Sequence, residues 1–209
     1  MSKASFPTRP ALALAGIGLT AAVLLAGLNE LTRDPIRQAR DDRAVAALQQ
    51  VLSPERYDNR ISQDVTTLRI DGLDEPARVY RARRNGQPSA AVIDMTTPKG
   101  YSGDIRLLIA VTPAAEVISV RAVEHRETPG LGDKIERRRS DWIEQFSGRS
   151  LGHPARREWA SDQRGGAFDT LTSATLTSTA VIDAIARSLA SFERAGEAIW
   201  TDRAEPGEL

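Results

Sequence analysis

A run of small hydroxyl residues near the end of the chain is the segment best suited to bind a phosphate group. It reads Asp-Thr-Leu-Thr-Ser-Ala-Thr-Leu-Thr-Ser over residues 169–178, and the apolar periodicity that follows predicts a helix from about Ser178 to Ala195. Thr177 or Ser178 is the expected N-cap of this helix. Free N–H groups, hydroxyls and the positive end of a helix dipole together favour a phosphate. On these residues alone, an ordinary Ser/Thr-capped helix start is the simpler interpretation.

A second candidate is the loop from Glu124 to Lys134, which reads Glu-His-Arg-Glu-Thr-Pro-Gly-Leu-Gly-Asp-Lys between a predicted strand and a predicted helix. Its proline and two glycines permit close approach of the backbone to a ligand, and His125 and Glu127 could act as acid and base. Taken alone, a structural loop with exposed polar residues is the simpler interpretation. The third segment, Lys99-Gly-Tyr-Ser-Gly-Asp-Ile105, is bracketed by glycines and by itself indicates only a turn.

The composition excludes several other chemistries. The 209 residues include no cysteine, which rules out disulfides, thiolate catalysis, iron–sulfur clusters and Cys zinc sites. The two histidines, at positions 125 and 153, lack metal-ligand spacing, so no metal site is expected. Because 28 basic side chains balance 28 acidic ones and aromatic residues make up 5%, the sequence does not predict nucleic-acid binding. Any redox chemistry must therefore come from an organic cofactor.

The N-terminal region predicts a membrane anchor. An uncharged run extends from Ala11 to Leu28, and a helix of that length rises about 27 Å, roughly the thickness of the hydrocarbon core. A cleaved signal peptide is the alternative, although its apolar region would be long and its cleavage pattern is poor. Basic residues flank the run on both sides, so the charge count leaves the orientation undecided.

The rest of the pattern predicts an α+β domain. Five strand-like runs occupy residues 65–70, 77–82, 90–95, 105–111 and 117–123, and the Asn85-Gly86 pair is a strong hairpin signal. Helices are predicted at residues 36–52, 133–146 and 178–195. Because the strands cluster in the middle of the chain and the helices at its ends, we expect an antiparallel twisted sheet with flanking helices.

These elements divide the chain into five parts. We predict an N-terminal tail (1–10), a transmembrane helix (11–31), a juxtamembrane helix with a linker (32–58), a folded domain (59–200) and a C-terminal tail (201–209).

Together, the three candidate segments resemble the G subunit of the Rnf (Rsx) electron transport complex, and the resemblance covers nearly the whole chain. The flavin-attachment pattern of that family, Asp-x-x-Ser/Thr-Gly-Ala-Thr, falls on residues 169–175. Ser173 stands where the family usually has glycine. If that position requires a positive φ, serine carries a strain of about 1–2 kcal/mol.

The resemblance implies that the hydroxyl of Thr175 is esterified to the phosphate of FMN and that a flavin transferase installs the group from FAD. It implies an FMN-binding domain that positions the flavin and tunes its potential, with no catalytic residue of its own. The other expected FMN contacts are Asp169, Thr172, Ser173, Ala174, Thr177, Ser178, Glu127, Thr128, Gly130, Leu131, Gly132, Tyr101 and Gly103.

The resemblance further implies an electron-carrying component of a membrane-bound complex that couples electron transfer to ion translocation, rather than an isolated enzyme. Its partners would be the other subunits of that complex. The protein would cross the bacterial inner membrane once and place its folded domain in the periplasm. Two alternatives stay open: the homologous C subunit of a sodium-translocating NADH:quinone reductase, and a non-catalytic, membrane-anchored binding or scaffold module.

Overall fold

The computed structural model describes residues 18–19, 21–22, 24 and 44–201. The chain separates into two compact units, Met1–Arg43 and Ala44–Leu209, and the fold below is that of the second. The predicted transmembrane helix at 11–31 lies outside the described residues, apart from positions 18, 19, 21, 22 and 24, which are helical. Within the described part of the chain, no helix is both long enough and apolar enough to span a membrane.

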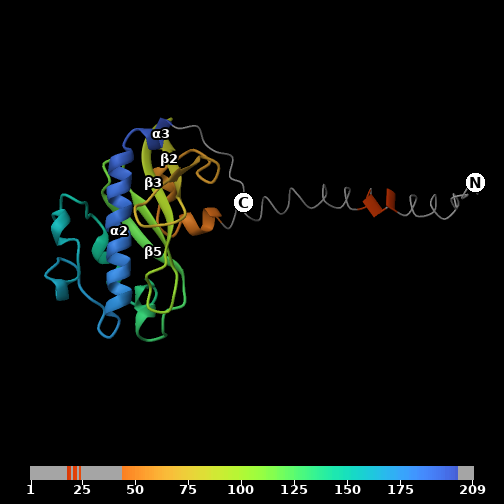
Figure 1. The fold of residues 1–209 in the computed structure, drawn as a ribbon. Helices are drawn as coiled ribbons and strands as arrows, with labels where there is room; N and C mark the ends of the chain where they lie inside the picture. Colours follow the sequence, from red (N-terminus) through yellow and green to blue (C-terminus); the bar gives the residue numbers. More distant parts are fainter. Residues whose placement is uncertain (1–17, 20, 23, 25–43, 202–209) are drawn as a thin grey trace, which may run out of the picture. The chain divides into compact units, whose positions relative to one another are not determined.

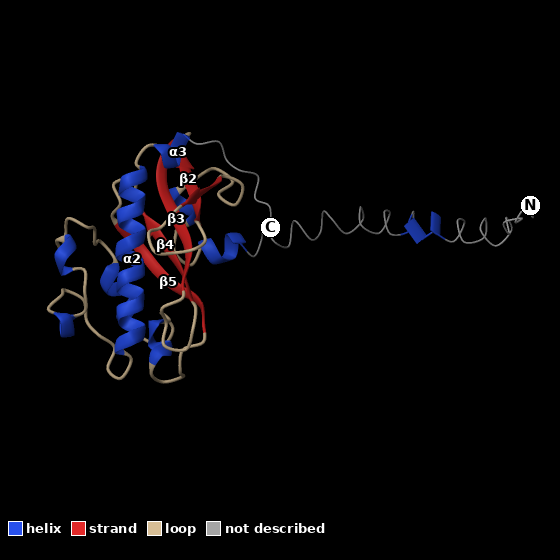
Figure 2. Cartoon of the chain, in the orientation of Figure 1, coloured by secondary structure: helices blue, strands red, loops and turns tan. Residues whose placement is uncertain are grey.

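Five strands form one antiparallel sheet, as the sequence predicts, and their spatial order follows the chain (Figure 2). The Asn85-Gly86 turn joins the second and third strands, and the positive φ angles of both residues, 53° and 75°, match the twist of a tight hairpin. The strands are β1 (Val65–Leu68), β2 (Ala77–Arg84), β3 (Gln87–Thr97), β4 (Ile105–Val111) and β5 (Val117–His125).

Both faces of the sheet are covered, which explains why most residues of β3 and β4 are buried without alternation. The long helix α2 (Thr175–Ala195) runs along one face, where Val181, Ile185 and Leu189 are buried in the main hydrophobic cluster (Figure 1). Residues 44–61 contribute Leu48, Leu52 and other apolar side chains to a second cluster built on alternate strand residues.

The segment from 133 to 146 is not a continuous helix, so that prediction is wrong. It forms two short 3-10 turns, η2 (Gly132–Ile135) and η3 (Trp142–Phe146). Between them, the Ser140 hydroxyl donates to the Lys134 carbonyl at 2.7 Å and accepts from the Trp142 N–H at 3.2 Å. A serine side chain that bonds nearby backbone groups in this way offers the chain an alternative to helix. The apolar residues of this segment still belong to the core, because Ile135, Ile143 and Phe146 are buried.

The remaining elements are short. They comprise η1 (Pro54–Arg56), η4 (Arg156–Glu158), η5 (Asp162–Arg164) and α3 (Ala198–Thr201), and residues 44–48 are also helical. Of the helix predicted at 36–52, only the part from residue 44 onward is described. The C-terminal helix ends at Ala195 as predicted but begins one turn early, at Thr175.

Candidate functional site

Thr175 is the first residue of α2, and the residue that caps this helix is Ala174. The predicted N-cap, Thr177 or Ser178, is therefore wrong. The Ser178 hydroxyl lies inside the helix, where it donates to the Ala174 carbonyl and accepts from the Leu171 N–H, both at 2.9 Å. Because alanine has no side-chain acceptor, the N-terminus of α2 lacks a side-chain cap.

The first turn of α2 leaves backbone donors available. Within the described part of the chain, no acceptor is recorded for the N–H groups of Thr175, Leu176 and Thr177. The Thr175 side chain is half-buried, and its hydroxyl donates a long hydrogen bond of 3.4 Å to Gln163 Oε1, from η5. The first turn also carries no acidic residue. Aligned N–H groups, a helix dipole and an accessible hydroxyl thus meet at one point.

The residue before the cap has an unusual backbone. Ser173 has a φ of 70°, in the left-handed region that favours glycine. This residue occupies the place where the attachment pattern usually has glycine. The structure therefore assigns a positive φ to that position, and Ser173 carries the strain.

Glu127 joins three segments that are far apart in the sequence. Its side chain is buried, with 4% of the residue exposed. Oε1 accepts the Ser102 N–H at 3.0 Å, and Oε2 accepts the hydroxyl of Thr177. The loop after β5, the turn around Ser102 and the first turn of α2 consequently meet at one carboxylate.

His125 and Glu136 hold the loop after β5 in place through hydrogen bonds. The Glu127 N–H donates to His125 Nδ1 at 3.2 Å, so the proton of a neutral imidazole sits on Nε2, which bonds Glu136 Oε1 at 3.0 Å. Arg138, which also bonds Glu136, is the main cause that lowers the pKa of the Glu136 carboxyl, and the hydrogen bond from His125 adds to it. Both ring nitrogens of His125 are thus engaged in hydrogen bonds within the protein.

Apolar side chains are exposed around this junction. Tyr101 is 68% exposed, Leu131 42% and Leu176 59%, and they are the exposed large apolar residues of the 44–201 segment. Each lies on one of the three segments that Glu127 connects, so the structure brings together the three candidate segments of the sequence. Isolated exposed apolar residues are ordinary, but here one lies on each of the three segments that meet at Glu127.

The other predicted contacts differ in their surroundings. The Thr128 carbonyl accepts the N–H groups of Leu131 and Gly132, both at 3.1 Å, and the Gly130 N–H donates to Asp133 Oδ1 at 2.8 Å. Ala174 is buried, Thr172 is exposed, and Gly103 has a φ of 126°.

Asp169 is exposed, and its main chain is held by two residues of η3. Its carbonyl accepts the Trp142 Nε1–H at 2.7 Å, and its N–H donates to Gln145 Oε1 at 2.8 Å. Sequence reasoning missed the contribution of Gln145, and also that of Gln163 at Thr175. Neither glutamine lies in a recognisable motif, so the sequence offered no signal for them.

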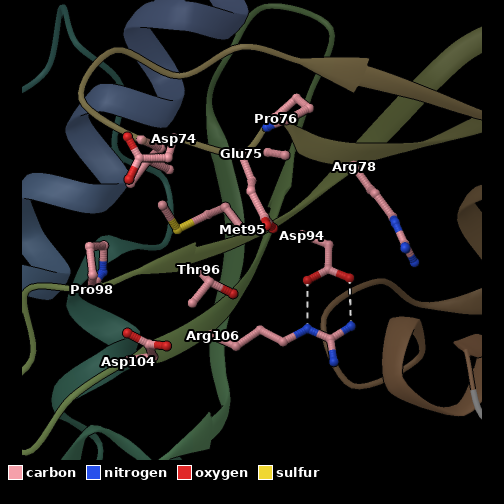
Figure 3. Close-up of a pocket in the computed structure, with 12 residues that line it drawn as sticks. Asp74, Glu75, Pro76, Arg78, Asp94, Met95, Thr96, Pro98, Asp104 and Arg106 are labelled. Carbon is pink, nitrogen blue, oxygen red and sulfur yellow. Dashed lines mark hydrogen bonds and ion pairs between the residues drawn. The ribbon is translucent and has the colours of Figure 1, made fainter.

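A separate cavity of about 540 Å³ opens at the end of the sheet where β2 begins (Figure 3). Its wall carries Asp94 and Arg106, which form a bidentate ion pair at 2.8 and 2.7 Å, and the hydrogen bond to Asp94 raises the pKa of Arg106. Pro98 and Asp104 flank the turn that carries Tyr101 and also line this cavity, whereas Thr175, Glu127 and Leu131 do not. Among the described residues, no His, Asp and Glu side chains group in a way that could hold a metal ion.

Comparison with known proteins gives the family. Residues 100–190, which include the turn, the loop and most of α2, match the FMN-binding domain. The G subunit of the ion-translocating oxidoreductase complex of Pseudomonas aeruginosa is 41% identical over 184 residues, which cover 87% of this chain and 84% of that protein.

Two further relatives carry the same name. The G subunit of Photorhabdus laumondii is 40% identical over 192 residues (86% of this chain, 90% of the relative). The G subunit of Salmonella typhimurium is 40% identical over 179 residues (82% and 87%). With this similarity extending over most of the sequence, the chain belongs to the family of G subunits of ion-translocating oxidoreductase complexes, and it contains an FMN-binding domain.

Proposed function

We propose that this protein carries FMN esterified to Thr175 and passes electrons within a membrane-bound, ion-translocating oxidoreductase complex. The observation that carries the proposal is the position of Thr175 at the uncapped N-terminus of α2, beside N–H groups with no recorded acceptor among the described residues. FMN supplies the electron-transfer chemistry, and the protein supplies attachment, position and electrostatics.

The N-terminus of α2 suits the phosphate of the flavin. The N–H groups of Thr175, Leu176 and Thr177 can donate to phosphate oxygens, and the positive end of the helix dipole stabilises their negative charge. In the attachment reaction, Thr175 Oγ1 bonds to the FMN phosphorus of FAD, the pyrophosphate bond breaks, AMP leaves and the hydroxyl proton is released. A flavin transferase would catalyse this step, because the hydroxyl of Thr175 bonds the neutral amide of Gln163 rather than a group that could take its proton.

The exposed apolar side chains suit the ring system of the flavin. Tyr101, Leu131 and Leu176 offer uncharged surface around the attachment point. Burying part of such a surface against a planar ring contributes about 25 cal/mol per Å² of apolar area removed from water. These residues would therefore orient the ring while the ester keeps it from dissociating.

The direct test is flavin attachment. The protein is expressed with a flavin transferase and analysed by intact mass and by ultraviolet fluorescence after denaturing electrophoresis. We expect one flavin per chain in the wild type, none in Thr175→Ala, and normal attachment in Thr172→Ala, whose side chain is exposed two residues before the cap. A colourless wild type would overturn the proposal and favour a non-catalytic scaffold.

We also propose that the chain crosses the bacterial inner membrane once, through the uncharged run from Ala11 to Leu28, and places the domain in the periplasm. The absence of cysteine makes this easy to test, because a single Gln63→Cys substitution creates the only thiol. A membrane-impermeant maleimide should label this variant in intact spheroplasts. Labelling only after lysis would place the domain in the cytoplasm. Purification of the native complex would show whether its neighbours are those of an Rnf-type complex or of a sodium-translocating quinone reductase.

A further inference from the structure

Among the described residues, Glu127 is the side chain that connects all three segments around the attachment threonine. Its two oxygens accept hydrogen bonds from residues 25 positions before it and 50 positions after it in the chain. Burial of a carboxylate is costly unless its oxygens are hydrogen-bonded, and here both have a donor. The arrangement therefore holds the loop, the turn and the helix in one relative position.

Two glycines make room for this carboxylate. A Cβ on Gly100 would lie 2.7 Å from Glu127 Oε1, and a Cβ on Gly132 would lie 2.8 Å from Oε2 and 2.9 Å from Glu127 Cβ. Such distances are too short for non-bonded atoms, so a side chain at position 132 would displace Glu127. A Cβ at position 100 would also lie 2.2 Å from the Gly103 carbonyl oxygen, so the backbone of the turn excludes a side chain there as well. The backbone therefore passes close to the carboxylate on both sides.

The first turn of α2 depends on this contact more than a typical helix start does. Its cap is an alanine without a side-chain hydrogen bond, and it follows the strained Ser173. Thr177, the third residue of the helix, is 1% exposed, and its hydroxyl is bound to Glu127. Glu127 accordingly restrains a turn that lacks a cap of its own.

We infer that Glu127 is a positioning residue for flavin attachment at Thr175. By bonding Thr177 and Ser102 together, it fixes the N–H groups of the first turn and the Tyr101 turn relative to each other before the flavin arrives. The inference rests on the proposed function. It assigns Glu127 no contact with the flavin, because both carboxylate oxygens are already engaged within the protein.

The experiment separates the effect of the two hydrogen bonds of Glu127 from the effect of its negative charge. Glu127→Gln has the same shape, can still accept from Ser102 through its carbonyl, and can donate to the Thr177 oxygen through its amide. Glu127→Ala removes both contacts. Each variant is incubated with a flavin transferase and FAD, and the initial rate of attachment is measured by mass. We expect Glu127→Gln to load at close to the wild-type rate and Glu127→Ala to load at least about tenfold more slowly.

A second pair of variants, at Thr177, tests the same contact with smaller changes that should leave the fold intact. Thr177→Val preserves the shape of the side chain but removes its hydroxyl, whereas Thr177→Ser keeps the hydroxyl and removes only the methyl group. Only the first should slow attachment, and both should keep wild-type far-ultraviolet circular dichroism. In the fraction that does load, the visible circular dichroism of the bound flavin should be weaker in Thr177→Val than in the wild type, because the first turn is less restrained.

Glu116→Gln is the matched control, since Glu116 is exposed in the turn before β5, at the end of that strand away from Glu127. Attachment at the wild-type rate in both Glu127→Ala and Thr177→Val would overturn the inference, as would a Glu127→Gln variant as slow as Glu127→Ala. If the wild type itself does not load, it is the proposed function that fails. If the wild type loads and Thr175→Ala does not, the proposed function stands whatever the Glu127 variants do.

Discussion

At the scale of single residues, Ser173 is the clearest case of a side chain that opposes its backbone. Its φ of 70° costs a serine about 1–2 kcal/mol, and glycine adopts this conformation without that cost. Ser173→Gly also gives the unfolded chain more freedom, which offsets part of the gain. We expect the free energy of unfolding in urea to rise by about 0.5–1 kcal/mol, with attachment no slower than in the wild type. A decrease in stability would show that the serine makes a compensating contact.

Glu136 predicts a pH dependence of stability. Hydrogen bonds from Arg138 and then from His125 lower the pKa of Glu136 below its ordinary value of 4.5. A carboxyl with a lowered pKa in the folded state contributes stability above its unfolded pKa, and this contribution is lost as the pH falls through the folded pKa. Because Glu136 is partly exposed, solvent screening keeps the effect modest.

The measurement is the melting temperature of the wild type and of Glu136→Gln at two pH values. The wild type should be more stable at pH 7, and the difference should shrink below pH 4.5. A difference that is equal at both pH values would contradict the linkage.

At the scale of elements, the packing of the loop after β5 against α2 depends on a residue without a side chain. Gly132→Ala would bring a Cβ to 2.8 and 2.9 Å from atoms of Glu127 and 3.2 Å from Thr177 Oγ1. We expect a loss of about 1–3 kcal/mol in unfolding free energy, together with slower flavin attachment. Gly152→Ala is the control, since its Cβ would have no neighbour closer than Ser150 Oγ at 3.8 Å. Equal effects of the two substitutions would argue against a special role for Gly132.

The elements also show which features a sequence can predict. The strands were predictable because alternation, apolar runs and the Asn85-Gly86 turn are local signals. The segment 133–146 was not, because the Ser140 hydroxyl bonds nearby backbone groups and breaks a helix that the apolar spacing favours. The start of α2 was placed one turn late, because hydroxyl residues resemble caps even when, like Ser178, they lie inside the helix.

For the site, motifs predicted which segments converge but not how they are connected. The connection is a pair of hydrogen bonds from Ser102 and Thr177 to Glu127, across separations of 25 and 50 residues. No pattern in the sequence encodes such a long-range contact.

At the scale of the whole domain, a buried arginine joins the beginning and the end of the folded unit. Arg81, on β2, is 2% exposed; it bonds Asp64 at 2.6 Å and the carbonyl of Ile199, in α3, at 3.0 Å. Arg83 repeats the pattern, with Asp64 at 2.8 Å and the Trp200 carbonyl at 2.7 Å. The two arginines therefore fasten α3 to the sheet and to the segment before β1.

Removal of Arg81 should destabilise the domain strongly, because Arg81→Ala leaves Asp64 with one guanidinium fewer and the Ile199 carbonyl without this donor. We expect a loss of about 3 kcal/mol in chemical denaturation. Arg84→Ala, at the exposed end of the same strand, should change stability by less than about 0.5 kcal/mol. Similar losses in the two variants would contradict the role of the buried arginine.

The position of Thr175 relative to this arginine pair has a mechanical consequence. α2 has 21 residues, with Thr175 at one end and α3 following at the other (Figure 1). A helix of that length measures about 30 Å, and Val181, Ile185 and Leu189 along it are buried in the main hydrophobic cluster. Because the first turn of α2 is also bound to Glu127, a redox group carried on Thr175 would have its point of attachment fixed relative to the sheet.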